Sequence, residues 1–231
     1  MRQIVLDTET TGLSTKNGDR IIEIGCVEIV DRIITGKTFH TYVNPERPVG
    51  LHTLAITGIK DQFLLDKPKF SLIVDDFLKF TDNAELIIHN APFDIDFINN
   101  ELKLLNHNIK DIYPEFKIID TLVLARTMHP GQRNNLDALC KRYNINIERA
   151  LHGALLDANI LAKLILKMTA GQINLNFDVA ENIIGNLKDT NKDVNILEKK
   201  LFKSKHENLK IIYANLEEVN LHEKYIKELL K

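Results

Sequence analysis

The order of the apolar segments is the feature that most constrains the fold of this chain. Residues 3–6, 20–30 and 33–43 are rich in β-branched side chains, which indicates three strands in succession, the last two joined near Asp31 and Arg32. Further along, segments with helical spacing alternate with short apolar runs. We expect helices over 70–80, 93–105, 136–143 and 154–168, and strands over 85–88 and 117–119. This order predicts an α/β protein with a mixed sheet flanked by helices.

The pattern changes after Met168, where Thr169, Ala170 and Gly171 form a typical helix end. The following residues are rich in Asn and Asp and have weak periodicity. We therefore expect three parts. They are a folded domain over residues 1–170, a linker over 171–195, and a short C-terminal segment over 196–231 whose apolar helix face requires a binding partner.

Length and charge set the outer limits. A chain of 231 residues can bury one good core. It has no apolar run near the roughly 18 residues that cross a bilayer, and no signal-peptide pattern, so we expect a soluble cytoplasmic protein without a membrane partner. A net charge of −2 gives no support for charge-driven nucleic-acid binding, but it does not exclude an enzyme that holds only a strand end. Cys26 and Cys140 lie in apolar stretches and are expected to be buried free thiols.

Four carboxylates and one histidine stand in three short motifs. The motifs are Val5 to Gly12, with Asp7 and Glu9; His89 to Asp94; and Leu151 to Asp157, with His152. Carboxylates among apolar residues are unfavourable unless their charge is compensated, and a converging group of them is usually compensated by a hard divalent cation. The sequence therefore predicts a metal site.

Local spacing indicates which side chains can share this site. In an extended segment Asp7 and Glu9 project to the same face. Asp94 falls in the first turn of a helix that follows a buried strand, where open α/β sheets place ligands. Asp96 is its nearest competitor, but roughly 200° separate the two on a helix, so only one faces the site.

His152 and Asp157 are five residues apart, which in one continuous helix would leave them about 140° apart and unable to share a target. Gly153 suggests that His152 lies in the loop before the helix and Asp157 within it. Taken alone, each of these residues also fits a structural role: a solvated strand face, a helix N-terminal charge or a structural histidine. In the company of the carboxylates, His152 is a candidate general base.

Together these motifs resemble the three signature motifs of the DEDD-type 3′–5′ exonucleases, histidine subgroup. The chain is similar in particular to the proofreading exonuclease subunits of bacterial DNA polymerase III, over about residues 2–171 and more weakly from 209 to the end. Supporting stretches are Arg20 to Gly25, Phe63 to Pro68 and Asn135 to Cys140. The resemblance implies a ribonuclease-H-like fold and a two-metal hydrolysis of the terminal phosphodiester.

By motif position, the resemblance makes Asp7, Glu9, Asp94 and Asp157 the ligands of two Mg²⁺ or Mn²⁺ ions and His152 the base that deprotonates the attacking water. Oxygen-only ligation suits these ions, and the lack of a Cys/His cluster disfavours structural zinc. The segment 53–59 matches the region that packs against the terminal nucleotide, although many relatives carry a histidine where this chain has Thr57. We expect substrate contacts from three metal-site residues, Asp7, Glu9 and Asp157. Three further candidates are Thr53 and Thr57 in this segment and His89 in the second motif.

Two partner sites are expected beyond residue 171. Residues 172–177 are similar to the short peptides that dock replication proteins on the sliding clamp, with Gln172, Leu175 and Phe177 as contacts. The tail from Leu209 would, by resemblance, bind the catalytic (alpha) subunit of DNA polymerase III, and the small theta subunit is a further candidate partner.

We predict an enzyme that removes mispaired nucleotides from the 3′ end of single-stranded or frayed DNA during replication. One alternative is a stand-alone exonuclease that trims RNA or degrades oligonucleotides, and a solitary enzyme would have no use for the tail. The other is a non-catalytic tether between polymerase and clamp. A tether gains nothing from burying four carboxylates, so the motifs favour an enzyme.

Overall fold

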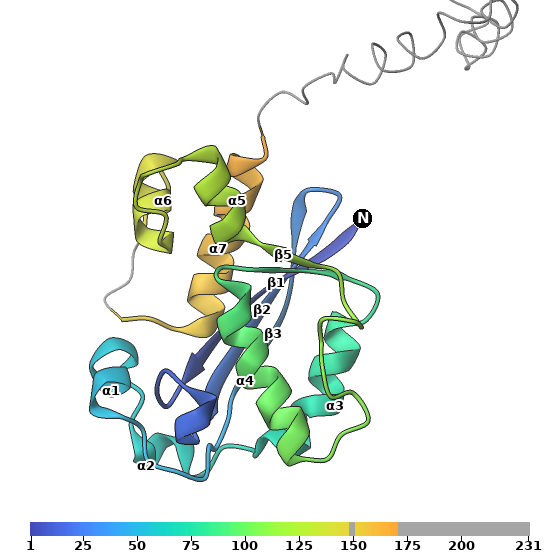
Figure 1. Cartoon of the computed structure of the whole chain (residues 1–231), viewed down its shortest axis with the longest axis vertical. Coiled ribbons are helices and arrows are strands. Elements are labelled where there is room, and N and C mark those ends of the chain that lie inside the picture. Colours follow the sequence, from blue (N-terminus) through green and yellow to red (C-terminus); the bar gives the residue numbers. More distant parts are fainter. Residues whose placement is uncertain (148–150, 171–231) are drawn as a thin grey trace, which may run out of the picture. The chain divides into compact units, whose positions relative to one another are not determined.

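The computed structural model describes residues 1–147 and 151–170, which form a five-stranded sheet with helices on both faces (Figure 1). The strands are β1 (Arg2–Thr10), β2 (Ile21–Val30), β3 (Ile33–Tyr42), β4 (Glu85–Ile88) and β5 (Ile118–Asp120). The helices are α1 (Leu51–Thr57), α2 (Asp61–Leu64), α3 (Phe70–Thr81), α4 (Ala91–Leu104), α5 (Thr121–Met128), α6 (Leu136–Arg142) and α7 (Ala154–Met168), with a short 3₁₀ helix at Thr15–Asn17.

The sheet has the order β3-β2-β1-β4-β5 and is mixed. The first three strands pair antiparallel, whereas β4 runs parallel to β1 and β5 runs parallel to β4. This arrangement confirms the prediction of antiparallel strands followed by helix–strand alternation. It also brings the carboxyl ends of β1, β4 and β5 to one edge of the sheet, where α/β proteins place their ligands.

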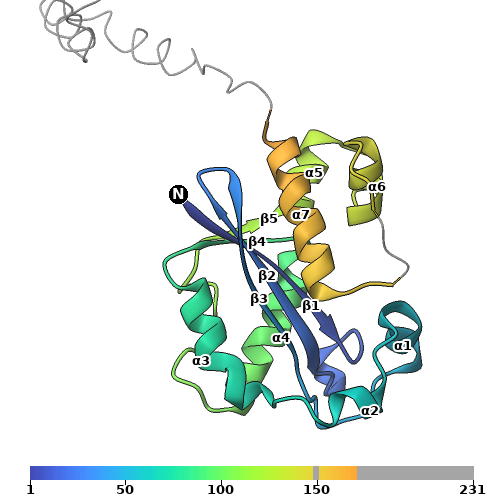
Figure 2. The ribbon, with the colours of Figure 1, turned by 180° about the vertical axis from the view of Figure 1, so that it is seen from behind.

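Alternate residues of the strands face two separate cores. Leu6 and Ile24 pack with the apolar residues of α3 and α4, while Val5 and Val27 pack with those of α5, α6 and α7. Figures 1 and 2 show α3 and α4 on one face of the sheet and α7 on the other. The apolar side chains of the strands therefore pack against the apolar faces of the helices on both sides of the sheet.

Several bounds differ from the sequence prediction. The apolar pattern suggested a first strand over 3–6, but β1 continues to Thr10 because its backbone pairs with β2 beyond the last apolar residue. Asp7 and Glu9 therefore lie within the strand. The helices α1, α2 and α5 were not predicted. Of these, α5 begins at a clear cap, since the Asp120 side chain accepts bonds from the backbone of Leu122 and Val123.

Other expectations are confirmed. Helix α7 and strand β4 have the predicted bounds, and Cys26 and Cys140 are buried cysteines that form no disulfide among the described residues. No helix in the described ranges is both long and apolar enough to cross a membrane. The predicted linker over 171–195, its clamp-binding peptide and the segment over 196–231 lie outside the described residues.

Candidate active site

Strand β1 presents Asp7 and Glu9 at the centre of the sheet. In the register with β2, Asp7 lies opposite Gly25 and Glu9 opposite Glu23. A Cβ atom at Gly25 would overlap the backbone of Ala154 and Leu155. Helix α7 therefore begins directly on the β2 backbone, beside the two carboxylates of β1. A glycine inside a strand is a known sign of such a close approach, and this signal was present in the sequence.

The segment before α7 places His152 and Asp157 together, as the spacing predicted. Gly153 is the N-cap residue of α7, and His152 lies in the loop before it. The His152 backbone N–H donates to the Ile56 carbonyl of α1 over 3.0 Å, and Asp157 N–H donates to Gly153 over 2.8 Å. These bonds fix the loop on one side and the first helical turn on the other.

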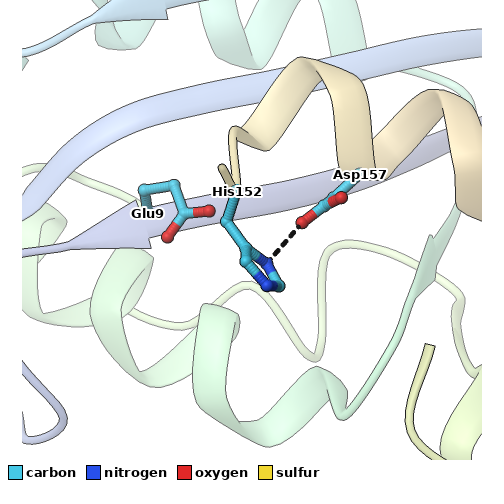
Figure 3. Close-up of side chains that lie close together, drawn as sticks. All are labelled: Glu9, His152 and Asp157. Atoms are coloured by element: carbon cyan, nitrogen blue, oxygen red, sulfur yellow. Dashed lines mark hydrogen bonds and ion pairs between the residues drawn. The ribbon is translucent and has the colours of Figure 1, made fainter. Parts of the chain in front are cut away.

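The two side chains form a hydrogen-bonded pair, drawn in Figure 3, with 2.9 Å between His152 Nδ1 and Asp157 Oδ2. Asp157 is 4% exposed, whereas the His152 side chain is 43% exposed. An ionised carboxylate can only accept, so in this contact Nδ1 carries the proton and a neutral ring keeps its lone pair on Nε2. Asp157 thereby orients an exposed imidazole whose basic nitrogen is Nε2.

Glu9 completes a compact group with this pair. One potential ligand atom from each of Glu9, His152 and Asp157 lies within 4.8 Å of the others, and among the described residues this is the one group of three or more such side chains that could hold a metal ion. Figure 3 shows the Glu9 carboxylate and the His152 ring side by side near the end of β1. The two carboxylates are oxygen donors that fit a hard divalent cation, and the imidazole lies beside them.

Asp94 reaches β1 from the opposite face of the sheet. It lies in the first turn of α4 and is 3% exposed. Its Oδ1 accepts bonds from the backbone N–H and the hydroxyl of Thr8, at 2.9 and 2.7 Å. Burial raises the pKa of Asp94 to about 7, with a further contribution from the Asp120 charge, although the Thr8 bonds act in the opposite direction. This buried carboxylate therefore favours a nearby cation.

The structure also separates Asp94 from its competitor. Asp96 is exposed and accepts a bond from Thr15. Asp94 instead lies against Thr8, the residue between Asp7 and Glu9 in β1. Neither Asp7 nor Asp94 belongs to the compact group of Glu9, His152 and Asp157. Asp7 is kept beside this group by strand β1, which also carries Glu9, and Asp94 is kept there by its hydrogen bonds to Thr8.

The substrate-contact candidates in α1 are engaged within that helix. Thr53 and Thr57 are buried; the Thr57 hydroxyl donates to the Thr53 carbonyl over 2.9 Å and accepts from Ile59 N–H over 3.2 Å. Thr57 thus shapes the C-terminal end of α1, and a contact of either threonine with substrate stays a prediction. The contribution of α1 that the sequence did not indicate is a backbone one, the Ile56 carbonyl that holds His152.

His89 joins the end of β4 to the following elements. Its Nδ1 lies 2.9 Å from the Thr121 hydroxyl, and its ring also bonds to the backbone of Asn134. Burial, with the nearby Arg126 charge, lowers the pKa of His89, whereas Asp120 and the Asn134 bond oppose this shift. These contacts describe a structural histidine, and its predicted contact with substrate stays a prediction.

Comparisons with known proteins agree with this geometry. Residues 4–165 match the family model described as Exonuclease. The chain is 49% identical to the DNA polymerase III subunit epsilon of Buchnera aphidicola subsp. Schizaphis graminum, over 98% of this chain and 96% of the relative. It is 52% identical to the protein of the same name from Salmonella typhimurium, over 76% of this chain and 74% of the relative.

Among solved structures, the fold is similar to exonuclease X in complex with 5′ overhanging duplex DNA. The TM-score is 0.57 at 28% identity, covering 73% of this chain and 91% of the other. This similarity confirms the ribonuclease-H-like arrangement that the motifs implied. With a family match over most of its length and an epsilon subunit nearly half identical along almost the whole chain, the protein belongs to the exonuclease family and, within it, to the DNA polymerase III epsilon subunits.

Proposed function

We propose that this chain is the proofreading exonuclease of a replicative DNA polymerase, a 3′–5′ exonuclease that removes mispaired nucleotides from the 3′ end of DNA. The observation that carries the proposal is the group of Glu9, His152 and Asp157, assembled from two distant motifs at the end of β1. Relatives named epsilon subunit support the DNA substrate, and so does the exonuclease structure that holds DNA.

The ligands we propose for two divalent cations, Mg²⁺ or Mn²⁺, are Asp7, Glu9, Asp94 and Asp157. The buried carboxylates of Asp94 and Asp157 fit a hard cation, and Glu9 lies within reach of Asp157. When bound, such ions lower the pKa of a water molecule and neutralise charge that develops on the phosphate and the leaving oxygen.

In the reaction that we propose, the oxygen of a water molecule bonds to the terminal phosphorus while a proton passes to Nε2 of His152. The bond between phosphorus and the 3′-oxygen of the penultimate nucleotide breaks, the 3′-oxygen takes up a proton from solvent, and a nucleoside 5′-monophosphate leaves. Asp157 keeps the imidazole in the tautomer that can accept this proton and stabilises the imidazolium that forms. Because the His152 side chain is exposed, the 3′ end of a DNA strand can approach this general base.

As a subunit of a DNA polymerase the chain would work in the cytoplasm with other proteins. We propose that residues 196–231 bind the catalytic alpha subunit and that Gln172, Leu175 and Phe177 contact the sliding clamp; theta is a further candidate partner. Removing residues from Gln172 onward should leave hydrolysis of short single strands almost unchanged, because all five reactive groups precede the cut. The same truncation should abolish co-elution with the alpha subunit, and Leu175→Ala with Phe177→Ala should weaken only the clamp contact.

A direct assay separates this function from that of a stand-alone ribonuclease. Purified protein should shorten 5′-labelled DNA one nucleotide at a time from the 3′ end, faster at mispaired than at paired ends, and should stop in EDTA. The Asp7→Ala variant should be inactive. Undiminished cleavage in chelator would reject the two-metal mechanism. Efficient degradation of short RNA, together with no association with the alpha subunit at micromolar concentration, would favour the stand-alone enzyme.

A further inference from the structure

A fifth acidic side chain, Glu23, lies beside the proposed active site and has no part in the mechanism above. Glu23 stands directly opposite Glu9 in the β1–β2 pair, so both side chains lie on the same face of the sheet. Although it is a carboxylate on a central strand, Glu23 is only 3% exposed. A buried charge at this position calls for a physical reason.

The two oxygens of Glu23 have different surroundings. Oε1 lies 2.8 Å from Nε2 of His40 on the neighbouring strand β3, and the His40 side chain is 32% exposed. Oε2 is buried and has no hydrogen-bond partner among the described residues. A buried carboxylate oxygen without a hydrogen-bond partner is energetically unfavourable. His40 therefore accounts for the position of Oε1, and the burial of Oε2 needs a reason other than a hydrogen bond to that atom.

The carboxylate of Glu23 lies against the start of α7. A Cβ atom at Gly153 would stand 3.7 and 3.8 Å from the two Glu23 oxygens, which is ordinary van der Waals contact. Gly153 is the N-cap of α7 and offers no side chain to the first N–H groups of the helix. Negative charge is favoured at this end of a helix, so Glu23 complements the start of α7 through its charge and not through a hydrogen bond.

Gly153, which lies near Glu23, is the direct neighbour of the proposed base His152 in the chain. Gly153 connects His152 to α7, and the other supports of the segment are the Ile56 carbonyl under the His152 amide and Gly25 under Ala154. We propose that Glu23, held by His40, is a positioning residue that fixes the Gly153 backbone and thereby the place of the His152 imidazole. This inference rests on the proposed role of His152 as base.

The geometry favours positioning over a role as an additional metal ligand. Although Glu23 faces the same side as Glu9, it is not part of the group formed by Glu9, His152 and Asp157 in the described residues. One of its oxygens is directed to His40, and the carboxylate as a whole faces the position that a side chain at Gly153 would occupy. A positioning residue should affect turnover through His152 alone and leave metal binding unchanged.

The test compares two buried acids of the same strand. Glu28 is also buried on β2, but it pairs with Arg2 and Thr35 away from the site, so Glu28→Gln is the matched control. In steady-state assays on a 5′-labelled single strand, Glu23→Gln should lower kcat about tenfold, the scale expected for a small misplacement of a catalytic group. Its KM and the metal concentration at half-maximal activity should stay within twofold of wild type. Glu28→Gln should retain wild-type kcat.

A double-mutant cycle with His152→Gln then asks whether Glu23 acts through the base. In single-turnover reactions, Glu23→Gln should have almost no further effect once His152 is replaced. An equal loss in both backgrounds would overturn the inference, and so would a raised metal requirement or an unchanged kcat. Wild-type turnover in His152→Gln alone would instead overturn the proposed base and this inference with it.

A readout without catalysis completes the test. In metal-free protein, the imidazole NMR signals of His152, assigned by their loss in His152→Gln, should move in Glu23→Gln and not in Glu28→Gln. If Glu23→Gln does not fold, His40→Phe decides, because it releases Glu23 while keeping an aromatic ring beside Tyr42. His40→Phe should lower kcat in the same direction and lose this effect in the His152→Gln background, and wild-type kcat in His40→Phe would reject the proposal.

Discussion

Asp94 accepts two hydrogen bonds from Thr8, one from the backbone and one from the hydroxyl, so a carboxylate of α4 is fixed near the carboxyl end of the strand that carries Asp7 and Glu9. The two faces of the sheet are joined at this point. The relation explains how a side chain from the α4 face is kept beside a group that lies on the α7 face.

Thr8→Val removes the hydroxyl and keeps the shape of the side chain. The backbone bond to Asp94 remains, but the buried carboxylate loses one of its two donors from Thr8, which should lower the free energy of unfolding by about 1–3 kcal/mol. Exonuclease activity should fall as well, because Asp94 is no longer held in one orientation. Thr81→Val is the control, since the buried Thr81 hydroxyl bonds within α3 at Phe77 and Leu78. Equal activity in the two variants would contradict this account.

Replacing the proposed base separates chemistry from binding. In His152→Gln the attacking water loses its proton acceptor, so turnover should fall roughly 10²–10⁴-fold while metal binding stays nearly intact. His129→Gln is the matched control, because His129 pairs with Tyr143 outside the proposed site. Single-turnover rates and metal titrations of both variants check the expectation, and a wild-type rate in His152→Gln would refute the assignment.

The two glycines that flank the start of α7 should respond differently to alanine. At Gly25 a Cβ atom would overlap the backbone of Ala154 and Leu155, so Gly25→Ala should push α7 off β2, reduce stability by about 1–3 kcal/mol and impair hydrolysis. At Gly153 a Cβ atom would meet only ordinary contacts with Glu23, and the loss should stay below about 1 kcal/mol. Denaturant titrations of both variants measure the difference. A Gly153→Ala variant less stable than Gly25→Ala would contradict the packing described for α7.

The burial of His89 predicts a particular pH dependence. Burial lowers its pKa in the folded state, so on acidification the unfolded chain takes up the proton first, near its ordinary value of about 6.5. The stability that neutral His89 contributes is thus complete above this pH and declines as the pH falls towards the folded pKa. The difference in unfolding free energy between wild type and His89→Gln should be larger at pH 7.5 than at pH 5. A larger difference at pH 5, measured by urea titration, would show that the folded pKa is raised instead.

The sequence predicted the elements whose periodicity is strong and local. The helix 154–168 and the strand 85–88 were found at their observed bounds because their apolar spacing is undisturbed. The sequence predicts an N-terminal strand that ends at Leu6, because two charged residues interrupt the apolar run. The backbone nevertheless continues to pair with β2 beyond that residue. Helix α1 carries Thr53, Ile56 and Thr57, whose branched side chains weaken a helical signal.

The site was predictable in its residue types but not in its connections. Asp7, Glu9, Asp94, His152 and Asp157 were singled out by motif and by local spacing. The bond from Thr8 to Asp94, the support of His152 by Ile56 and the contact of Glu23 with Gly153 join segments far apart in the chain. Such contacts depend on sheet order and strand register, and no spacing within a single segment encodes them.

The packing of α7 against β2 also determines how late in protein synthesis the proposed active site can form. Gly25 is translated early, but the backbone that packs against it belongs to Ala154 and Leu155, which are translated much later. In the same way, the edge of β1 that pairs with β4 stays unpaired until β4 has been translated. Contacts of such long sequence separation slow folding, and during synthesis they cannot form before both partners have left the ribosome. On the proposed mechanism, a nascent chain would carry Asp7 and Glu9 for most of its translation without the ability to cut DNA. The site would be complete only once α7 has left the ribosome.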